Sequence, residues 1–286
     1  MVFRSSKAIF LTIGLLLVFV LAFYAFWIEP TSLTIKAVTI PIRGLNHPIR
    51  AVLIGDPQPM KPFWPAKRIQ WAMEQAQAQK PDIVFFVGDY AYEHHLLRSL
   101  HLTQWLMVNP ADTVEAMARI HAPLGSYAVL GNHDWWWNGP EMIRLLNKTH
   151  IRLLRDQSVY IHSGSTKLWV AGLDDMAPNK PYDIAAMLAK TNNQAPIVLL
   201  AHSPDVFPSV PQQVALTLAG HTHGGQVYIP FIGRPIVPIQ HKKYAYGYFN
   251  ENGHQLFVTS GIGISIIPIR FLTPPEIVVL NLIPSP

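Results

Sequence analysis

Side chains that bind divalent metal ions follow several short apolar runs of this sequence. In chain order, the runs end at Asp56, at Asp89, at Asn132, at His202, and at the pair His221 and His223. Apolar runs of this kind, bounded by glycine and turn residues, predict buried strands. Because ligands of open α/β sheets gather just beyond the carboxyl ends of the strands, we expect these side chains to meet. Carboxylate, amide and imidazole groups together form a donor set for a pair of divalent metals.

Each motif taken alone has a plainer interpretation. A single Gly-Asn-His-Asp sequence, as at 131–134, usually forms a turn, and a lone histidine after a strand is more often a hydrogen-bonded core residue. An ordered set of five such strand ends is hard to explain in that way. In addition, His221 and His223 are two residues apart in an extended segment, so their side chains project to the same side. The pattern therefore favours a metal site.

In order and spacing, these motifs resemble the signature of the calcineurin-like metallophosphoesterase superfamily. That signature reads Asp-x-(His), Gly-Asp, Gly-Asn-His-Asp, His, Gly-His-x-His, and it spans 56–223 here. The chain is similar to the membrane-anchored phosphodiesterase branch of the superfamily in particular. That branch shows a His-Gly-Gly-Gln sequence and later Ser-Gly-x-Gly, Pro-x-Arg and Pro-Pro-Glu blocks, which are matched by 223–226, 260–263, 268–270 and 274–276. The resemblance implies a four-layer α/β sandwich, in which two mixed β-sheets are flanked by helices.

The resemblance also implies a role for each residue of the motifs. Asp56, Asp89 and His223 would hold one divalent ion, and Asp89, Asn132, His202 and His221 would hold a second, with Asp89 bridging. Manganese is favoured among Mn, Fe, Zn and Mg. Two such ions activate a water molecule for attack on phosphorus. The implied activity is metal-dependent hydrolysis of a phosphoester, in particular a phosphodiester.

Three residues are expected to contact the substrate, and a fourth is expected to orient one of them. His133 would contact the phosphate and protonate the leaving oxygen as a general acid. Asp134 would orient the His133 ring and raise its pKa. Asn132 would contact the phosphate, and Arg270 could do so as well, although a structural salt bridge explains Arg270 equally well.

One position departs from the superfamily pattern. A histidine usually stands two residues after the first aspartate, and here that position is Gln58. An amide oxygen is a harder and usually weaker ligand than an imidazole nitrogen. We therefore expect a weaker first metal site that prefers Mn²⁺, Mg²⁺ or Fe²⁺ to Zn²⁺. In a stronger form of this hypothesis Gln58 does not bind metal and the first site is partly empty.

An uncharged stretch at 8–28 is long enough to cross a bilayer as a helix. Arg4 and Lys7 precede the stretch, and Tyr24 and Trp27 lie where an interfacial aromatic belt would be. A cleaved signal peptide is the alternative, but the end of the stretch is a poor cleavage site. We expect a single-pass inner-membrane protein with residues 1–7 in the cytoplasm. A tether with a first strand at 29–48 would then lead to an extracytoplasmic catalytic domain at 49–286.

The rest of the chain alternates between strand-like and helix-like patterns, which predicts a layered α/β domain with a mixed sheet. The expected helices are 65–80, 113–121, 140–150 and 183–191, and the expected strands outside the motifs are 33–42, 159–162, 168–173, 255–259 and 276–282. The apolar segment 90–110 is either a helix packed on the core, or a lid or membrane-touching face.

The amino-acid composition limits the classes of binding partner and of chemistry that we expect. The net charge is +5 with no long Lys/Arg run, so no nucleic-acid partner is expected, and the lack of cysteine excludes thiolate chemistry. The oligomeric state stays open. The anchor and the apolar loops suggest a phosphorylated substrate that is lipid-linked, such as a nucleotide-lipid phosphate. The alternative is a non-catalytic, membrane-anchored protein of the same fold that binds phosphate or lipid. Only the presence of Gln58 favours this alternative.

Overall fold

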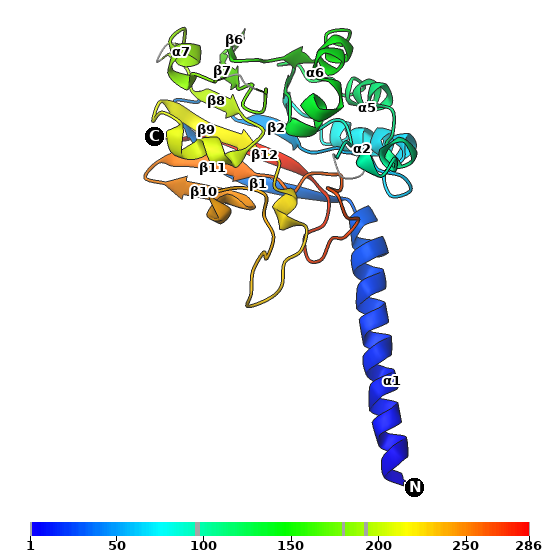
Figure 1. Cartoon of the computed structure of the whole chain (residues 1–286). Helices are drawn as coiled ribbons and strands as arrows, with labels where there is room; N and C mark the ends of the chain where they lie inside the picture. The colour runs from blue at the N-terminus through cyan, green and yellow to red at the C-terminus, as the bar shows by residue number, and fades with distance from the viewer. Residues whose placement is uncertain (1, 95–97, 179–180, 192–193, 286) are drawn as a thin grey trace.

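Two six-stranded sheets lie face to face in the computed structural model, which describes residues 2–94, 98–178, 181–191 and 194–285 (Figure 1). The first sheet has the order β1-β12-β2-β3-β4-β5 and the second has the order β10-β11-β9-β8-β7-β6. The strands of the first sheet are β1 (Thr34–Arg43), β2 (Ile49–Ile54), β3 (Ile83–Val87), β4 (Ser126–Val129), β5 (Arg152–Leu153) and β12 (Glu276–Ser285). Those of the second sheet are β6 (Gln157–Ser163), β7 (Thr166–Gly172), β8 (Ile197–Leu200), β9 (Val214–Ala219), β10 (Gly247–Glu251) and β11 (His254–Val258).

Both sheets are mixed, as the resemblance implies. In the first sheet β2, β3, β4 and β5 run parallel, and β12 is antiparallel to β2 but parallel to β1. In the second sheet β7, β8, β9 and β11 run parallel, while β6 and β10 pair antiparallel at the two edges. Because the central strands of each sheet run parallel, the carboxyl ends of β2, β3 and β4 share one edge, and so do those of β8 and β9.

The near-continuous apolar runs follow from burial on both faces of the sheets. In β3, for example, Ile83, Phe85 and Val87 pack into the core between the two sheets, whereas Val84 and Phe86 pack under the helices. Alternate residues of a strand point to opposite faces, so a strand between two apolar layers must be apolar at every position.

Helices cover the outer face of each sheet. The first sheet carries α2 (Ala66–Gln77), α5 (Pro110–Met117) and α6 (Asn132–Leu146), and the second carries α7 (Ile184–Leu188) with η3 (Pro204–Ser209) and η5 (Lys242–Tyr244). The short helices α4 (Thr103–Leu106) and η4 (His223–Gly225) lie in connections. The predicted four-layer sandwich is confirmed.

Two helices begin earlier than their sequence patterns suggest. Asn109 caps α5 by accepting from the amide of Ala111, so Pro110 is the first helical residue. In the same way α6 begins at Asn132, at the motif that we expected to follow a strand as a loop. Asn138 has non-helical torsions just before Pro140 and interrupts α6. The helical sequence pattern therefore restarts at Pro140, which is where the helix was expected to begin.

The segment 90–110 divides into a buried and an exposed part. Residues 95–97 lie outside the part of the chain that the structure describes. Tyr90 and Tyr92 are fully buried, whereas Leu100 and Trp105 are exposed. The described part of the segment therefore combines core packing with an apolar outer surface.

The N-terminal helix extends away from the sandwich (Figure 1). It consists of α1 (Val2–Phe23), continues through η1 (Tyr24–Ile28), and ends in η2 (Glu29–Thr31). The segment Ala8–Thr31, of 24 residues, is long and apolar enough to cross a membrane, and nearly all of its side chains are exposed. This finding agrees with the predicted membrane helix.

Candidate metal centre

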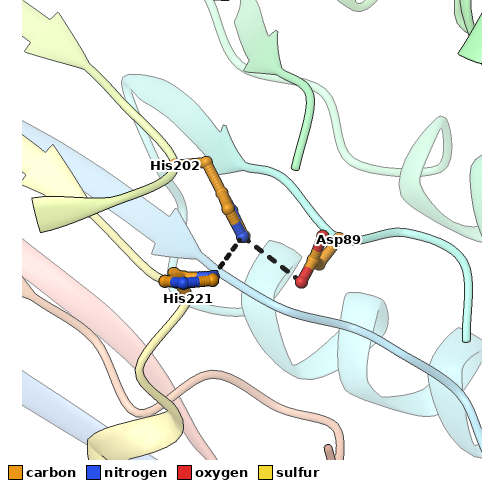
Figure 2. A group of neighbouring side chains, drawn as sticks. All are labelled: Asp89, His202 and His221. Carbon is orange, nitrogen blue, oxygen red and sulfur yellow. Dashed lines mark hydrogen bonds and ion pairs between the residues drawn. The ribbon is translucent and has the colours of Figure 1, made fainter. Parts of the chain in front are cut away.

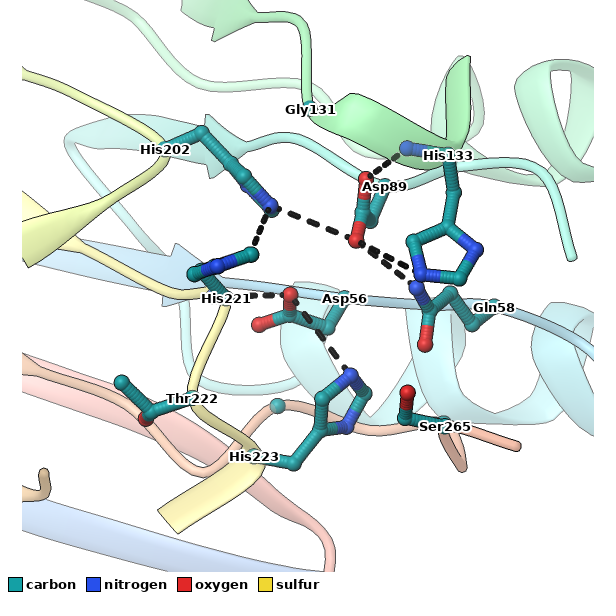
Figure 3. Close-up of polar contacts among 12 residues, drawn as sticks. Asp56, Gln58, Asp89, Gly131, His133, His202, His221, Thr222, His223 and Ser265 are labelled. Atoms are coloured by element: carbon teal, nitrogen blue, oxygen red, sulfur yellow. Dashed lines mark hydrogen bonds and ion pairs between the residues drawn. The ribbon is translucent and has the colours of Figure 1, made fainter. Parts of the chain in front are cut away.

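The carboxyl ends of five strands meet between the two sheets (Figure 3). Each strand end delivers one or two of the predicted ligands. Asp56 follows β2, Asp89 follows β3, Asn132 follows β4, His202 follows β8, and His221 follows β9. The backbone joins these strand ends directly, because the amide of Asp56 donates to the carbonyl of Gly88 and the amide of Gly220 donates to the carbonyl of His202.

Three side chains lie within reach of a single ion (Figure 2). His202 Nε2 is 3.3 Å from Asp89 Oδ2 and 3.1 Å from His221 Nδ1. The three possible ligand atoms lie within 4.8 Å of one another. Asn132 completes the group, since its Oδ1 is 3.2 Å from His202 Nε2. These are the four residues that were predicted to hold the second metal.

Backbone carbonyls select the tautomers of both histidines. His202 Nδ1 lies 2.7 Å from the carbonyl of Val87, and His221 Nε2 lies 3.2 Å from the carbonyl of Pro238. Only an N–H can donate to a carbonyl, so in each neutral ring the other nitrogen carries a lone pair. Those two lone pairs face each other across 3.1 Å. A histidine whose outer nitrogen donates to a carbonyl is the usual arrangement around a protein metal.

The predicted first site lies on the other side of Asp89. His223 Nε2 is 3.9 Å from Asp56 Oδ1, and the same oxygen accepts from the amide of His221 at 2.9 Å. Asp56 Oδ2 is buried and has no hydrogen-bond partner in the described part of the chain. The loop that carries His223 thus lies directly against Asp56.

The donor set fits divalent ions for two reasons. Buried polar atoms are normally hydrogen-bonded, so an unpaired carboxylate oxygen such as Asp56 Oδ2 requires a ligand of another kind. Moreover, positive φ angles occur at Asp56 (48°), Asp89 (60°), His221 (70°) and His223 (48°). Such strained torsions in residues other than glycine concentrate at functional sites. Both features indicate that the backbone is held so that these side chains converge.

Burial keeps most of the imidazoles in the neutral form that binds metal. It lowers the pKa of His221 to about 4, with a further contribution from the charge of His202, and it lowers the pKa of His223 well below 6.5. His202 is the exception. Burial opposes its charge, but Asp89 and Asp56 outweigh burial and raise its pKa to about 10. A proton and a metal cation therefore compete for the same lone pair on Nε2.

Gln58 lies in the site, but its amide nitrogen faces the carboxylate of Asp89. Its Nε2 donates to Asp89 Oδ2 at 2.7 Å, while its buried Oε1 has no partner among the described residues. In this orientation the amide competes with a cation for Asp89. A half-turn of the amide would place Oε1 next to Asp89 Oδ2 instead. Two such oxygens repel each other unless a cation lies between them.

His133 is held at the rim of the centre. Its backbone amide donates to Asp89 Oδ1 at 2.8 Å, and its Nε2 lies 3.9 Å from Asp89 Oδ2. The ring packs against Trp136, with 4.7 Å between the ring centroids. Burial lowers the pKa of His133, whereas the charge of Asp89 raises it. The geometry points its Nε2 toward the same space as the ligand atoms (Figure 3).

Asp134 was expected to orient His133, and the structure directs its hydrogen bonds to the backbone around Asp89. The Asp134 carboxylate is buried and accepts four backbone N–H groups, those of Asp89, Tyr90, Ala91 and Gly131, at 2.7–3.1 Å. Asp134 is the third residue of α6, where a carboxylate is favoured because it satisfies free amides. It therefore fixes the loop of Asp89 onto α6, and it acts on His133 only through the backbone.

Arg270 was expected either to contact the phosphate or to form a structural salt bridge, and its hydrogen bonds go to backbone carbonyls instead. Its guanidinium is fully buried and donates to the carbonyls of Ser260, Gly263 and Thr273 at 2.6–3.2 Å. All three guanidinium nitrogens are engaged with backbone carbonyls, and the side chain has no exposed surface from which to reach a substrate. Arg270 instead holds the loop 260–263 behind Asp56, where the amide of Gly263 donates to the carbonyl of Asp56 at 2.7 Å.

One carboxylate outside the predicted motifs also belongs to the site. Asp175 accepts from the amides of His202 and Ser203 at 3.0 and 2.9 Å, and so positions His202. It follows β7 and is thus one more acidic residue at a strand end, a signal that the sequence carried. A cavity of about 500 Å³ opens beside it, lined by Asp175, Tyr182, Asp205, His221, Pro238 and Gln240. The cavity borders the metal centre through His221.

Several known proteins are similar to this chain in sequence. YkuE of Bacillus subtilis, an uncharacterized metallophosphoesterase, is 29% identical over 264 residues, which cover 89% of this chain and 85% of that protein. Phosphodiesterase YaeI of Escherichia coli is 29% identical over 228 residues, or 77% of each chain. A transmembrane protein with a metallophosphoesterase domain from Danio rerio is 27% identical over 286 residues, covering 93% of this chain and 61% of that protein.

The model of the calcineurin-like phosphoesterase family matches residues 49–225. That segment runs from the first residue of β2 to the last residue of η4, so it contains all the strand ends described above. The family uses divalent metals, and the cluster of Asp89, His202 and His221 could hold one. This chain therefore belongs to the calcineurin-like phosphoesterase family and is a phosphoesterase hydrolase.

Proposed function

We propose that this protein is a membrane-anchored phosphodiesterase that depends on two divalent metal ions, with manganese preferred. One observation carries the proposal. His202 Nε2 lies within hydrogen-bonding distance of both His221 Nδ1 and Asp89 Oδ2, although the three residues follow three separate strands. In the neutral rings, the lone pairs of the two histidine nitrogens would point at each other. Opposed lone pairs repel unless a cation or a proton lies between them. The family match supports the same interpretation.

Each residue has a role in this proposal. Asp56, Asp89 and His223 hold the first ion, and Asp89, Asn132, His202 and His221 hold the second, with Asp89 shared. When bound, the ions supply charge that binds the phosphate oxygens and lowers the pKa of a water molecule. The net negative charge of Asp56 and Asp89, which raises the pKa of His202 to about 10, supplies the attraction for these cations.

His133 supplies the proton that the leaving oxygen needs. Its ring is fixed by its backbone bond to Asp89 and by Trp136, so its Nε2 is held beside the phosphate position without binding a metal. The nearby carboxylate of Asp89 favours the protonated imidazole, while burial makes that proton easier to give up. Asn132 contacts the phosphate from the first turn of α6.

The substrate is proposed to be a phosphodiester of a lipid or of a nucleotide-linked lipid. Two features support this: the apolar helix at the N-terminus, and the cavity beside His221 that would receive a group attached to the phosphate. The positive charges of Arg4 and Lys7, which lie in the first turns of α1 before its uncharged stretch, favour an extracytoplasmic catalytic domain. The alternative function is non-catalytic binding of phosphate or lipid. One contact favours it, namely the hydrogen bond that Gln58 donates to Asp89.

Metal removal tests the proposal. The full-length chain in detergent should hydrolyse bis(p-nitrophenyl) phosphate with Mn²⁺ and lose this activity after treatment with EDTA. Resupplying Mn²⁺ at 100 times its dissociation constant should restore the activity and stabilise the fold by ~2.7 kcal/mol, seen as a rise in Tm. A rise in Tm without any turnover would support the non-catalytic alternative, and no response to Mn²⁺ in either measurement would exclude the metal-dependent function.

Gln58→His should strengthen the first metal site. Imidazole is a better ligand for Mn²⁺ and Zn²⁺ than an amide, and the substitution also removes the N–H that binds Asp89. We expect the weaker of two Mn²⁺ dissociation constants to fall roughly tenfold, or by ~1.4 kcal/mol, in a calorimetric titration. Gln213→His, at an exposed position, is the matched control. Equal Mn²⁺ affinity in Gln58→His and wild type would show that position 58 does not limit the site.

A further inference from the structure

Two loops next to the anchor expose large apolar side chains. The loops are 226–240 and 265–272, called here the apolar loops. In Figure 1 both extend from the sandwich on the side on which α1 leaves it, and the first of them reaches out in the direction that α1 takes. Their side chains are unusually exposed: Phe231 106%, Ile236 77%, Ile232 72%, Ile267 54% and Leu272 47%. Exposed patches of this kind mark interaction surfaces.

Neither apolar loop presents a charge outward. Arg234 is the only charged residue of the first loop, and Arg270 is the only one of the second. Arg234 donates to the hydroxyl of Thr273 at 2.9 Å and lies over the rings of Tyr228 and Tyr246 at 5.2 and 4.8 Å. Arg270 is fully buried. Both cations point back into the domain, so the outer surface of the loops is uncharged.

The tip of the first loop pairs several of its own backbone groups. The amide of Ile229 donates to the carbonyl of Gly233 at 2.8 Å, the amide of Gly233 donates to the carbonyl of Ile229 at 2.8 Å, and the amide of Ile232 also donates to Ile229, at 3.0 Å. Pro230 has no N–H to satisfy. Each backbone group paired in this way lowers the cost of moving the loop out of water, because lipid cannot replace the hydrogen bonds that water provides.

The second loop is tied to the base of the anchor. The amide of Arg270 donates to the carbonyl of Ala25 at 2.9 Å, and the amides of Leu272 and Thr273 donate to the carboxylate of Glu29. The ring of Tyr24 packs edge-on against Phe271. The two apolar loops are joined as well, since the amide of Tyr228 donates to the carbonyl of Phe271 at 2.8 Å. The anchor and both loops thus form one bonded unit.

We infer that the apolar loops form a docking surface that inserts into the headgroup and upper acyl region of the bilayer crossed by the N-terminal helix. This inference rests on the proposed membrane anchoring. The anchor fixes the loops beside the bilayer, and their uncharged apolar tips, one of which pairs part of its own backbone, match an interfacial environment. A lipid surface accounts for all three features, namely the exposure, the inward-facing cations and the continuity with α1.

Docking would fix the metal centre relative to the membrane. The first apolar loop begins directly after η4, whose first residue is the ligand His223. Gln226 joins the loops, because its Oε1 accepts from the amide of Ser265 at 2.8 Å. Insertion of Phe231 and Ile232 would therefore hold His223 at a set height above the lipid headgroups, which suits a phosphoester in the plane of the membrane.

The chain lacks cysteine, so single cysteines can carry a spin label without background. The full-length protein is placed in nanodiscs of phosphatidylcholine and phosphatidylglycerol, with labels at Phe231→Cys and Ile267→Cys. Leu16→Cys within α1 reports the anchor, and Ser165→Cys in the exposed β6–β7 turn is the control. Labels at 231 and 267 should collide with oxygen several-fold more, relative to a water-soluble nickel complex, than the label at 165. The label at 16 should be deeper still.

A second variant shows whether docking depends on the native side chains. Phe231→Asp in the Ile267→Cys background should shift the label at 267 toward water, whereas Ser165→Asp should leave it unchanged. Water-like labels at 231 and 267 beside a deep label at 16 would overturn the docking surface but leave the anchor intact. A water-like label at 16 would overturn both. Labels at 231 and 267 that are shielded from oxygen and nickel alike would assign the loops to a protein contact and also overturn the inference.

Discussion

Asp89→Asn is expected to abolish metal binding and phosphodiester hydrolysis together. Asp89 is the one residue shared by both proposed sites, and its Oδ2 lies 3.3 Å from His202 Nε2. The substitution keeps the shape of the side chain and an oxygen that can accept from the amide of His133, but it removes the negative charge that draws cations to the centre. If the ions supply several kcal/mol of transition-state stabilisation, the rate constant kcat should fall by at least ~10³-fold.

The measurement combines metal analysis with the hydrolysis of bis(p-nitrophenyl) phosphate. Asp183→Asn is a matched control, because Asp183 is an exposed N-cap of α7 and asparagine caps a helix equally well. The control should retain wild-type metal content and rate. An Asp89→Asn protein that is folded, binds two Mn²⁺ ions per chain and turns over normally would disprove the shared-ligand arrangement.

His133→Ala is expected to lower kcat while leaving the metal content unchanged. The bond that fixes this segment to Asp89 comes from the backbone amide of residue 133, so it survives in alanine. Loss of a general acid typically lowers the rate by ~10²–10⁴-fold. The loss should be larger for a phenyl phosphodiester than for a p-nitrophenyl one, because a more basic leaving oxygen needs the proton more.

His162→Ala serves as the control, since His162 is an exposed residue of β6 on a different part of the fold. An equal loss for both leaving groups would remove His133 from the role of proton donor. A fall in bound metal in His133→Ala would instead indicate that the ring takes part in holding the ions.

The sequence pattern predicted a layered α/β domain and the convergence of the ligands for the same physical reason, whereas the four-layer sandwich was implied by the family resemblance. A strand buried on both faces must be apolar throughout, so a polar residue such as Asp56 or His202 marks the point where it leaves the core. Parallel strands then place those ends along one edge of each sheet. The strands expected at 159–162 and 168–173 correspond to β6 and β7, and the helix expected at 183–191 corresponds to α7, which Asp183 caps.

Contacts between distant segments could not be predicted in this way. Asp134 was expected to bind the adjacent histidine, but the structure offers it four amides, three of them from residues 43–45 positions away along the chain. Arg270 looks in the sequence like any exposed cation, and only the folded loops show that it is surrounded by carbonyls. The orientation of the Gln58 amide and the link between the apolar loops and the anchor also depend on tertiary packing.

The most direct test of the central claim is a crystal structure of the full-length chain grown with Mn²⁺, with anomalous scattering recorded for manganese. The account predicts two anomalous peaks, one among Asp89, Asn132, His202 and His221 and the other among Asp56, Asp89 and His223. Peaks at neither position, with Mn²⁺ present well above its dissociation constant, would contradict the proposed dinuclear centre.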